Sequence, residues 1–234
     1  MKNEFLNAIL SEKDDIKARG NMRFYKTGIG EYAEGDIFLG LTYPQNRRIA
    51  KMYYKTLLIA DLEYLLSSKY HEVRACTILA AVLKYSQGGT DEKKKIYDFY
   101  LKNSGKVNNW DLVDNSAPYI AGDFAFNFQR QNDLRLLAGS GNLWSERISI
   151  VATLYFIKHN NLDLTFELCK HFLYHRHDLI QKASGWMLRE AGKKDEARLE
   201  KFLTENISTI PRTTLRYAIE RFPEEKRKKY LKLR

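Results

Sequence analysis

The sequence has few residues that break helices and few that cross-link a chain. It holds only 4 prolines and 13 glycines among 234 residues, so long stretches are compatible with helix. Its 2 cysteines, Cys76 and Cys169, have neither C-x-x-C spacing nor an adjacent histidine, which excludes a disulfide framework and a cysteine-based metal motif. Both lie in apolar helical contexts and are predicted to be buried thiols.

Long apolar runs are also missing. No run approaches the roughly 20 residues needed to cross a bilayer. The opening Met1-Lys2-Asn3-Glu4 lacks the charged and then apolar layout of a signal peptide. We therefore expect a cytoplasmic protein with no membrane partner.

What is present favours a folded and mostly helical chain. Hydrophobic residues make up 44% and aromatic residues 13% of it, which is enough for a sizeable core. Residues 3–19 are predicted to form one helix that Gly20 ends, and residues 22–41 an irregular, glycine-rich segment. Further helices are predicted at residues 44–58, 62–66, 71–85 and 91–101, and from Trp110 onward.

The charge balance points to a polyanionic partner. Lysine and arginine number 39 against 29 acidic residues, a net charge of +10 with a pI near 9.4. Such an excess favours nucleic acid as the leading candidate partner.

Four cations and one tryptophan recur along the chain at a nearly constant spacing. The gaps between them are 36, 37, 35 and 34 residues, close to the period of HEAT repeats. The spacing predicts that residues 1–234 form a single all-α domain, an α-α superhelix (solenoid) of HEAT-like antiparallel helix pairs. Because no consensus repeats, chance spacing stays open as an alternative. The aligned residues are Arg74, Trp110, Arg147, Lys182 and Arg216.

Equivalent positions of stacked repeats line up on one surface, so these cations predict a basic groove. One helical turn after Trp110 comes Asp114, and one turn after Lys182 comes Trp186. Two tryptophans and one carboxylate would therefore stand in the middle of the groove. Asn109 is a good N-cap for the helix that Trp110 opens. A simpler interpretation makes Trp110 a core anchor and Asp114 a helix cap.

This set of residues suits a substrate that carries phosphates and becomes cationic at its reacting centre. Arg147 and Lys182 would hold phosphates. The indole faces would attract a cation, at about 0.5–2 kcal/mol each, and Asp114 would supply a negative charge. Cleavage of a glycosidic bond through an oxocarbenium-like sugar needs such a carboxylate. An alkylated, cationic purine leaves as a neutral molecule, so no second carboxylate is required.

Other motifs predict less. Gly28 and Gly30 lack the Gly-Lys-Ser/Thr ending of a phosphate loop. His171 and His175 stand at i and i+4, but interleaved cations favour a solvated helix end over a metal site. The basic run 226–229 is typical of a solvated helix face, with phosphate contact as an additional possibility.

Three motifs, in order along the chain, resemble those of a known family. They are Asn109-Trp110-Asp111-Leu112-Val113-Asp114, Trp144-Ser145-Glu146-Arg147-Ile148 and Lys182-Ala183-Ser184-Gly185-Trp186-Met187-Leu188-Arg189-Glu190. The chain resembles the alkylpurine DNA glycosylases built from HEAT-like repeats, the AlkD family, over most of its length. The resemblance implies a C-shaped solenoid whose basic concave face binds duplex DNA. It also implies that the protein removes 3-methyladenine and 7-methylguanine from that DNA without a metal or cofactor.

The resemblance also implies roles for individual residues. Asp114, Trp110 and Trp186 match the catalytic cleft of the family, and Arg147 matches its phosphate-binding arginine. The resemblance further implies that the lesion is reached through its sugar-phosphate backbone, without a pocket for an extruded base, unlike the usual base-flipping scheme. We expect a monomer that associates with the nucleoid when bound to alkylated duplex DNA.

Two other functions stay open from the sequence alone. A non-catalytic HEAT-repeat protein that binds damaged or branched DNA would need the basic groove but neither Asp114 nor both tryptophans. A protein scaffold would need an apolar or acidic face, against which the net charge of +10 argues.

Overall fold

The computed structural model describes residues 1–233, and within them the chain is helical. The one β-type contact in that range is an isolated bridge between Ile37 and Tyr70. No helix of the described chain is both long and apolar enough to span a membrane. The prediction of an all-α fold of packed helix pairs is confirmed.

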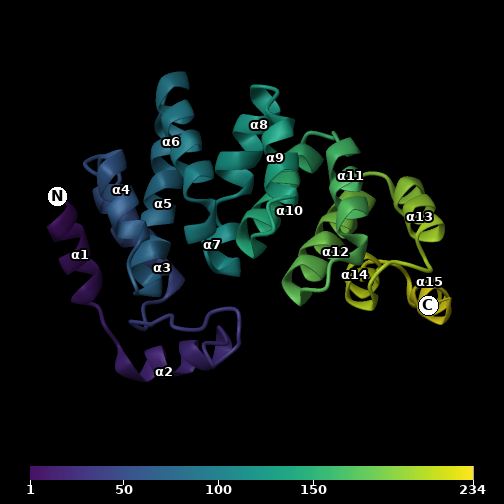
Figure 1. The fold of residues 1–234 in the computed structure, drawn as a ribbon, viewed down its shortest axis with the longest axis horizontal. Coiled ribbons are helices and arrows are strands. Elements are labelled where there is room, and N and C mark those ends of the chain that lie inside the picture. The colour runs from purple at the N-terminus through teal and green to yellow at the C-terminus, as the bar shows by residue number, and fades with distance from the viewer. Residues whose placement is uncertain (234) are drawn as a thin grey trace. The chain divides into compact units, whose positions relative to one another are not determined.

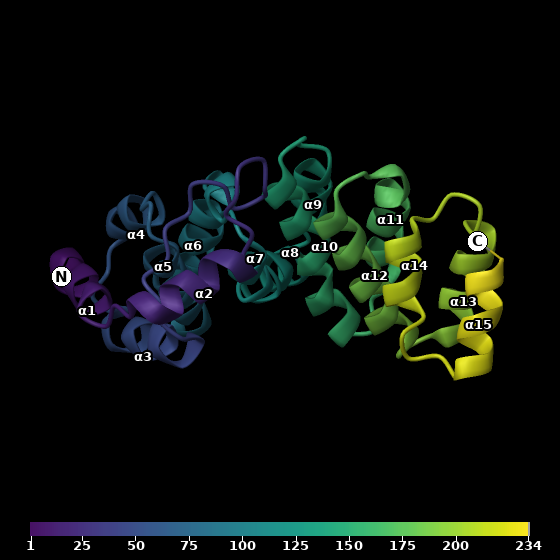
Figure 2. The ribbon, with the colours of Figure 1, turned by 90° about the horizontal axis from the view of Figure 1, so that it is seen from below.

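Contacts divide the chain into two compact units, with the boundary between Ser116 and Ala117. Figures 1 and 2 show their helices from two sides. The first unit holds α1 (Lys2–Leu10), α2 (Asp15–Phe24), α3 (Tyr43–Tyr53), α4 (Ile59–Leu66), α5 (His71–Gln87), α6 (Thr90–Lys102), η1 (Ser104–Lys106) and α7 (Trp110–Asp114). The second holds η2 (Pro118–Gly122), α8 (Asp123–Asn127), α9 (Gln131–Ala138), α10 (Leu143–Lys158), α11 (Asp163–His171), η3 (Phe172–Tyr174), α12 (Asp178–Gly192), α13 (Glu196–Glu205), α14 (Arg212–Ala218) and α15 (Glu224–Lys232).

Helix α5 is the centre of the first unit. It packs against α3, α4 and α6, and Val73, Cys76 and Ala80 on it are fully buried. Burial of large apolar side chains such as Ile49 and Leu62 around it contributes about 1.5–3 kcal/mol each. The core around α5 supports the segments that surround α7.

In the second unit α12 packs against both α10 and α14, and α11 and α13 also pack against α12. Helices α12 and α14 approach closely at Gly185, where an added Cβ would lie 2.5 Å from Tyr217 Cβ and 2.6 Å from the Thr214 carbonyl oxygen. Only glycine fits this crossing, which holds the neighbouring Trp186 at a fixed position on α12.

The N-terminal region differs from the prediction of one helix over residues 3–19 ended by Gly20. The helix breaks after Leu10, and Asp14 caps a second helix by accepting hydrogen bonds from the backbone N–H groups of Ile16 and Lys17. Gly20 lies inside α2. A side chain that accepts hydrogen bonds from the first free N–H groups of a helix favours the start of a helix at that point. Here the Asp14 cap outweighs the apolar spacing that continues across the break.

Residues 25–42 form an irregular strap, as the glycine-rich sequence predicted. Near the strap's end Gly40 has φ +88°, and a Cβ there would lie 2.1 Å from the Asp14 carbonyl oxygen. The strap runs from the end of α2 back to α3 within the first unit (Figure 1).

Candidate functional site

Helix α7 carries the first predicted motif. Asn109 is fully buried, and its side chain accepts a hydrogen bond of 2.8 Å from the Trp110 N–H, so the predicted N-cap is confirmed. Trp110 and Asp114 are both half-buried and stand one turn apart at the two ends of α7. The helix thus presents an indole and a carboxylate that are both partly accessible to solvent.

The indole of Trp110 belongs to an aromatic stack. Tyr25 lies against it at 5.4 Å between ring centroids and 16° between planes, and the edge of Phe24 meets it at 5.9 Å. Tyr25 stacks in turn on Phe38 at 4.8 Å. One face of Trp110 is therefore covered by a residue of the strap. Sequence reasoning missed Tyr25, because an irregular segment gives no periodicity from which to place an aromatic.

Beneath this stack lies a buried network around His71, which is 2% exposed. Its Nε2 is 2.9 Å from Asp111 Oδ2, to which the Tyr25 hydroxyl also donates at 3.3 Å. Its Nδ1 is 3.7 Å from Asp36. Burial alone would lower the pKa of His71, but the charge of Asp111, the hydrogen bond to Asp111 and the nearby Asp36 carboxylate outweigh it and raise the pKa to about 9. His71 is thus an imidazolium at neutral pH.

Arg74 belongs to the same network and is 3% exposed. Its guanidinium pairs with Asp36 at 2.7 Å and donates to the Ser68 carbonyl oxygen at 2.8 Å. Burial would raise the pKa of Asp36, but the nearby His71 ring and the charge of Arg74 lower it. This burial argues against the phosphate contact predicted for Arg74 and gives it a structural role within the core of the first unit.

Glu72 fixes the strap to α5. Its two carboxylate oxygens accept hydrogen bonds of 2.8 Å each from the backbone N–H groups of Leu39 and Gly40. Because the side chain is 2% exposed, these charge-assisted bonds are shielded from water. The strap, and with it Phe38 and Tyr25, is held against α5 and α7.

The strap, α3, α5 and α7 enclose a cavity of about 330 Å³ beside Trp110. Asp111 lines it, whereas Asp114 does not. The lining residues are Asn21, Tyr25, Phe38, Leu41, Tyr43, Asn46, His71, Glu72, Ala75, Ile78, Leu79, Trp110, Asp111, Leu112 and Asn115.

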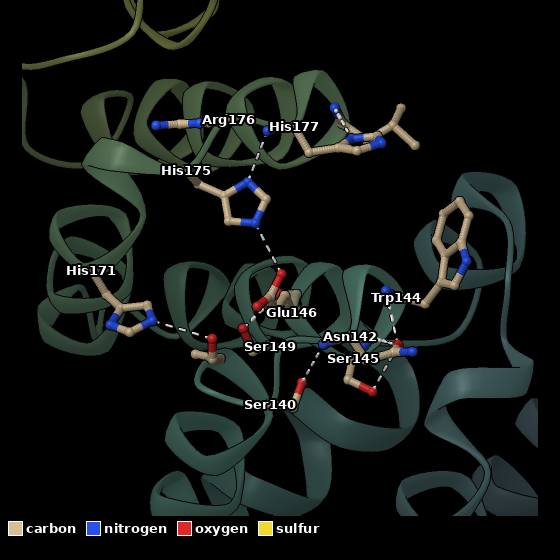
Figure 3. A network of polar contacts seen from close by, with 12 residues as sticks. Ser140, Asn142, Trp144, Ser145, Glu146, Ser149, His171, His175, Arg176 and His177 are labelled. Atoms are coloured by element: carbon tan, nitrogen blue, oxygen red, sulfur yellow. Dashed lines mark hydrogen bonds and ion pairs between the residues drawn. The ribbon is translucent and has the colours of Figure 1, made fainter. Parts of the chain in front are cut away.

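In the second unit Arg147 on α10 is 5% exposed and donates a 2.6 Å hydrogen bond to the Leu179 carbonyl oxygen at the start of α12. Beside it on α10, Glu146 accepts from His175 at 3.0 Å. Figure 3 shows His175 bridging Glu146 and the backbone N–H of His177. Arg147 thus lies at the junction of α10 and α12, next to the residue that pairs with His175.

The histidines of this region do not converge on one point. The ring of His171 hydrogen-bonds the Ala138 carbonyl oxygen at 3.2 Å, and His177 Nδ1 accepts from the Leu179 N–H at 3.1 Å (Figure 3). Burial, together with the charge of His175, lowers the pKa of His177. Across residues 1–233 no group of three or more His, Cys, Asp or Glu side chains is placed to hold a metal ion.

Lys182 and Arg216 come together in the second unit. They line a hollow of about 620 Å³ formed by α12, α14 and α15, in which Lys182 also pairs with Asp178 at 2.6 Å. Arg212 and Arg227 line the same hollow. Sequence reasoning missed these two arginines as members of one cluster, although Arg227 lies within the basic run that it noted.

Trp186 lies on α12 and is half-buried, one turn after Lys182. The predicted residues are thus divided between the units, with Arg74, Trp110 and Asp114 in the first and Arg147, Lys182, Trp186 and Arg216 in the second.

The family model described as DNA alkylation repair enzyme matches residues 6–222 of this sequence, which is nearly the whole chain. The chain belongs to the DNA alkylation repair enzyme family. The fold is similar to that of a solved structure described as a predicted DNA alkylation repair enzyme from Enterococcus faecalis. The similarity has a TM-score of 0.72 at 19% sequence identity and covers 91% of this chain and 97% of the other. No curated protein matches the sequence.

Membership of the DNA alkylation repair enzyme family gives the chain a role in DNA repair and makes DNA its partner. That partner agrees with the net charge of +10. The structure shows the surroundings of the candidate residues. Helix α7 carries a stacked indole and a half-buried carboxylate, and α12, α14 and α15 form a hollow lined by cations.

Proposed function

We propose that the protein is a monofunctional DNA glycosylase that hydrolyses the N-glycosidic bond of cationic alkylated purines in duplex DNA. The substrates are 3-methyladenine and 7-methylguanine nucleotides. The observation that carries the proposal is the pairing of Trp110 and Asp114 one turn apart on α7, both half-buried, in a chain of the DNA alkylation repair family.

In the proposed reaction the bond between the sugar C1′ and the purine nitrogen breaks first. Its electron pair neutralises the cationic base, and the positive charge passes to the sugar. The Asp114 carboxylate opposes that developing charge. Water then adds to C1′ and loses a proton to solvent, which leaves an abasic site and a free base. The step needs no general acid and no cofactor.

Trp110 contributes a ring face that attracts the cationic nucleotide and keeps water from it. We assign the same role to Trp186 from the resemblance of its motif. The stack of Tyr25 on one side of Trp110 fixes the plane of the indole, so that little side-chain entropy is lost when substrate binds. The side chain of Trp110 remains partly accessible to solvent. This accessibility favours a catalytic role for Trp110 over the role of a buried core anchor.

We assign phosphate binding to cations of the second unit. Lys182 and Arg216 line one hollow, to which we add Arg212 and Arg227. Arg147 is 5% exposed, nearly as buried as Arg74, and donates to the Leu179 carbonyl oxygen. The resemblance alone therefore supports a phosphate contact for Arg147, and the exposed Arg216 is the stronger candidate.

Release of free 7-methylguanine and 3-methyladenine from alkylated duplex DNA by the purified protein tests the proposed function. We expect base release without strand cleavage, because a monofunctional enzyme leaves the abasic sugar intact. Binding without base release would instead identify a non-catalytic DNA-binding member of the family.

A further inference from the structure

Trp110, whose ring face the proposed reaction uses, stands on a helix too short to hold it. Helix α7 is 5 residues long, and Trp110 is its first residue. Helices shorter than about 12–15 residues are marginal in water by themselves, because a helix must first form a costly nucleus. Contacts with the strap and α5 must therefore set the position of the indole.

The indole belongs to a cluster formed by the rings of Trp110, Tyr25, Phe38 and His71, here called the ring cluster. Tyr25 stacks on Trp110 at 5.4 Å between ring centroids and on Phe38 at 4.8 Å. Phe38 stacks in turn on His71 at 4.5 Å, with 22° between the ring planes. The ring cluster thus connects a partly accessible indole on α7 to a buried imidazole on α5.

Hydrogen bonds close the ring cluster on the side of α7. Asp111 directly follows Trp110 in the chain. Its Oδ2 accepts from the Tyr25 hydroxyl at 3.3 Å and from His71 Nε2 at 2.9 Å. Tyr25 therefore contacts α7 twice, through its ring at Trp110 and through its hydroxyl at Asp111. These two contacts fix the plane of the Tyr25 ring, and with it the plane of the indole against which that ring lies.

The buried end of the ring cluster is fixed to α5 by charges. His71 Nδ1 lies 3.7 Å from Asp36 Oδ2, and Arg74 pairs with the same oxygen at 2.7 Å. All three side chains are buried. A shift of one of them would leave a buried charge without its partner, which is strongly unfavourable. His71 therefore has little freedom to move, and it holds Asp111 in place.

We propose that Tyr25 and His71 are positioning residues for the proposed glycosylase reaction, and that they act through the indole of Trp110. The proposal rests on the proposed function, because that function makes the indole part of the site. Groups that act on a substrate have to be held to within about 0.5 Å by packing and by hydrogen bonds. The ring cluster supplies the packing, and Asp111 accepts the hydrogen bonds.

Replacement of Tyr25 tests the packing. Tyr25→Leu should slow single-turnover excision of 7-methylguanine by about tenfold to a hundredfold, because a misplacement of about 1 Å costs up to about a hundredfold. Tyr25→Phe keeps the stack and should restore most of the rate. Tyr53→Leu is the matched control and should leave the rate unchanged, since Tyr53 is also half-buried in the first unit but packs against Phe5. A purely structural role would not change the rate constant at saturating protein, because the folded fraction still saturates the DNA.

A double-mutant cycle tests whether Tyr25 acts through Trp110. Tyr25→Leu should slow excision in the wild-type background but have no further effect in Trp110→Ala, which has no indole to hold. Equal slowing in both backgrounds would overturn the proposal, because Tyr25 would then act independently of Trp110. So would an unchanged rate constant for Tyr25→Leu in the wild-type background.

The role of His71 is tested in the same cycle. His71→Gln should slow excision when Trp110 is present and have no further effect in Trp110→Ala. Asp111→Asn interrupts the same link at a side chain that is 17% exposed, and it serves as the second variant if His71→Gln does not fold. If neither variant slows excision, His71 is not a positioning residue.

Nuclear magnetic resonance of the indole N–H groups separates this proposal from the proposed function. The protein has 3 tryptophans, and Trp110→Phe identifies the signal of Trp110. The order parameter of that N–H should fall from about 0.85, typical of a rigid group, to below about 0.6 in Tyr25→Leu. A value that stays near 0.85 in Tyr25→Leu would overturn the positioning role whether or not the protein releases base. A wild type that releases no base, although Tyr25→Leu frees its indole, would overturn the proposed function alone.

Discussion

Two carboxylates on α7 lie three residues apart and have different surroundings. Asp111 is committed to His71 and Tyr25 through one oxygen and lines the cavity with its side chain. Asp114 stands at the other end of α7 and is half-buried outside that cavity. The i to i+4 spacing places Asp114 on the face of Trp110, but no sequence pattern indicates that Asp111 pairs with a histidine 40 residues earlier.

The imidazolium of His71 makes the stability of the protein depend on pH. Its pKa is raised from an unfolded value of 6.5 to about 9, so its contribution is fully present below pH 6.5 and is lost as pH rises through 9. At most it is of the order of 3 kcal/mol. The difference in urea unfolding free energy between wild type and His71→Gln should shrink by that order from pH 6 to pH 10. A constant difference would mean that His71 is neutral in the folded protein.

The sequence predicts that both Arg74 and Arg216 bind DNA phosphates, but Arg74 is buried and Arg216 is exposed. We therefore expect opposite effects when each is replaced. Arg74→Met leaves Asp36 buried without its guanidinium partner and should destabilise the protein by about 3–5 kcal/mol. Arg216→Met, at an exposed position, should leave stability unchanged but weaken DNA binding. Denaturant unfolding and DNA titration of both variants check this. A stable Arg74→Met protein with weakened DNA binding would restore the groove role for Arg74.

At the scale of helices, the crossing of α12 and α14 depends on one glycine. Gly185→Ala would place a methyl group 2.5 Å from Tyr217 Cβ and 2.6 Å from the Thr214 carbonyl oxygen, and should destabilise the protein by about 1–3 kcal/mol. Gly20→Ala is the control, because nothing lies within 4 Å of that Cβ inside α2. It should stabilise the protein by about 0.5–1 kcal/mol. Thermal unfolding measures both, and a neutral Gly185→Ala would show that the helices can separate at little cost.

Much of the helical pattern was predictable from the sequence, because apolar spacing decides which face of a helix is buried. The helix predicted at residues 71–85 is observed as α5 (His71–Gln87), and the one at 91–101 as α6 (Thr90–Lys102). The break before Asp14 was not predicted, because a single capping residue hardly changes the spacing of apolar residues. The path of the strap was also beyond prediction, since Glu72 fixes it from 32 and 33 residues away.

The same limit applies to the candidate site. Trp110, Asp114 and Trp186 were predictable only as candidates, because repeat spacing and motifs mark them, and their catalytic roles stay a prediction. The structure leaves all three half-buried. The burial of Arg74 was not predictable, because its partner Asp36 comes from an irregular segment. A cation in a repeat register can serve the core as well as the surface, and only the tertiary contacts distinguish the two.

At the scale of the whole molecule, the net charge of +10 governs the encounter with DNA. Log affinity for duplex DNA should fall linearly with log salt, by roughly 0.9 for each phosphate neutralised. Arg212→Ala and Arg216→Ala, in the hollow of the second unit, should each flatten that slope by about 0.9. Fluorescence anisotropy between about 50 and 200 mM salt gives the slopes. Unchanged slopes in both variants would place the DNA elsewhere on the protein.

The central claim is that the charge of Asp114 stabilises the cationic sugar. Asp114→Asn keeps the shape of the side chain and removes the charge, so DNA binding should persist or tighten while the chemical step slows by about 10²–10³, equivalent to roughly 3–4 kcal/mol. Single-turnover excision of 7-methylguanine from a defined duplex measures that step directly. A drop of that size with DNA affinity retained is the predicted result, and an unchanged excision rate would contradict the account.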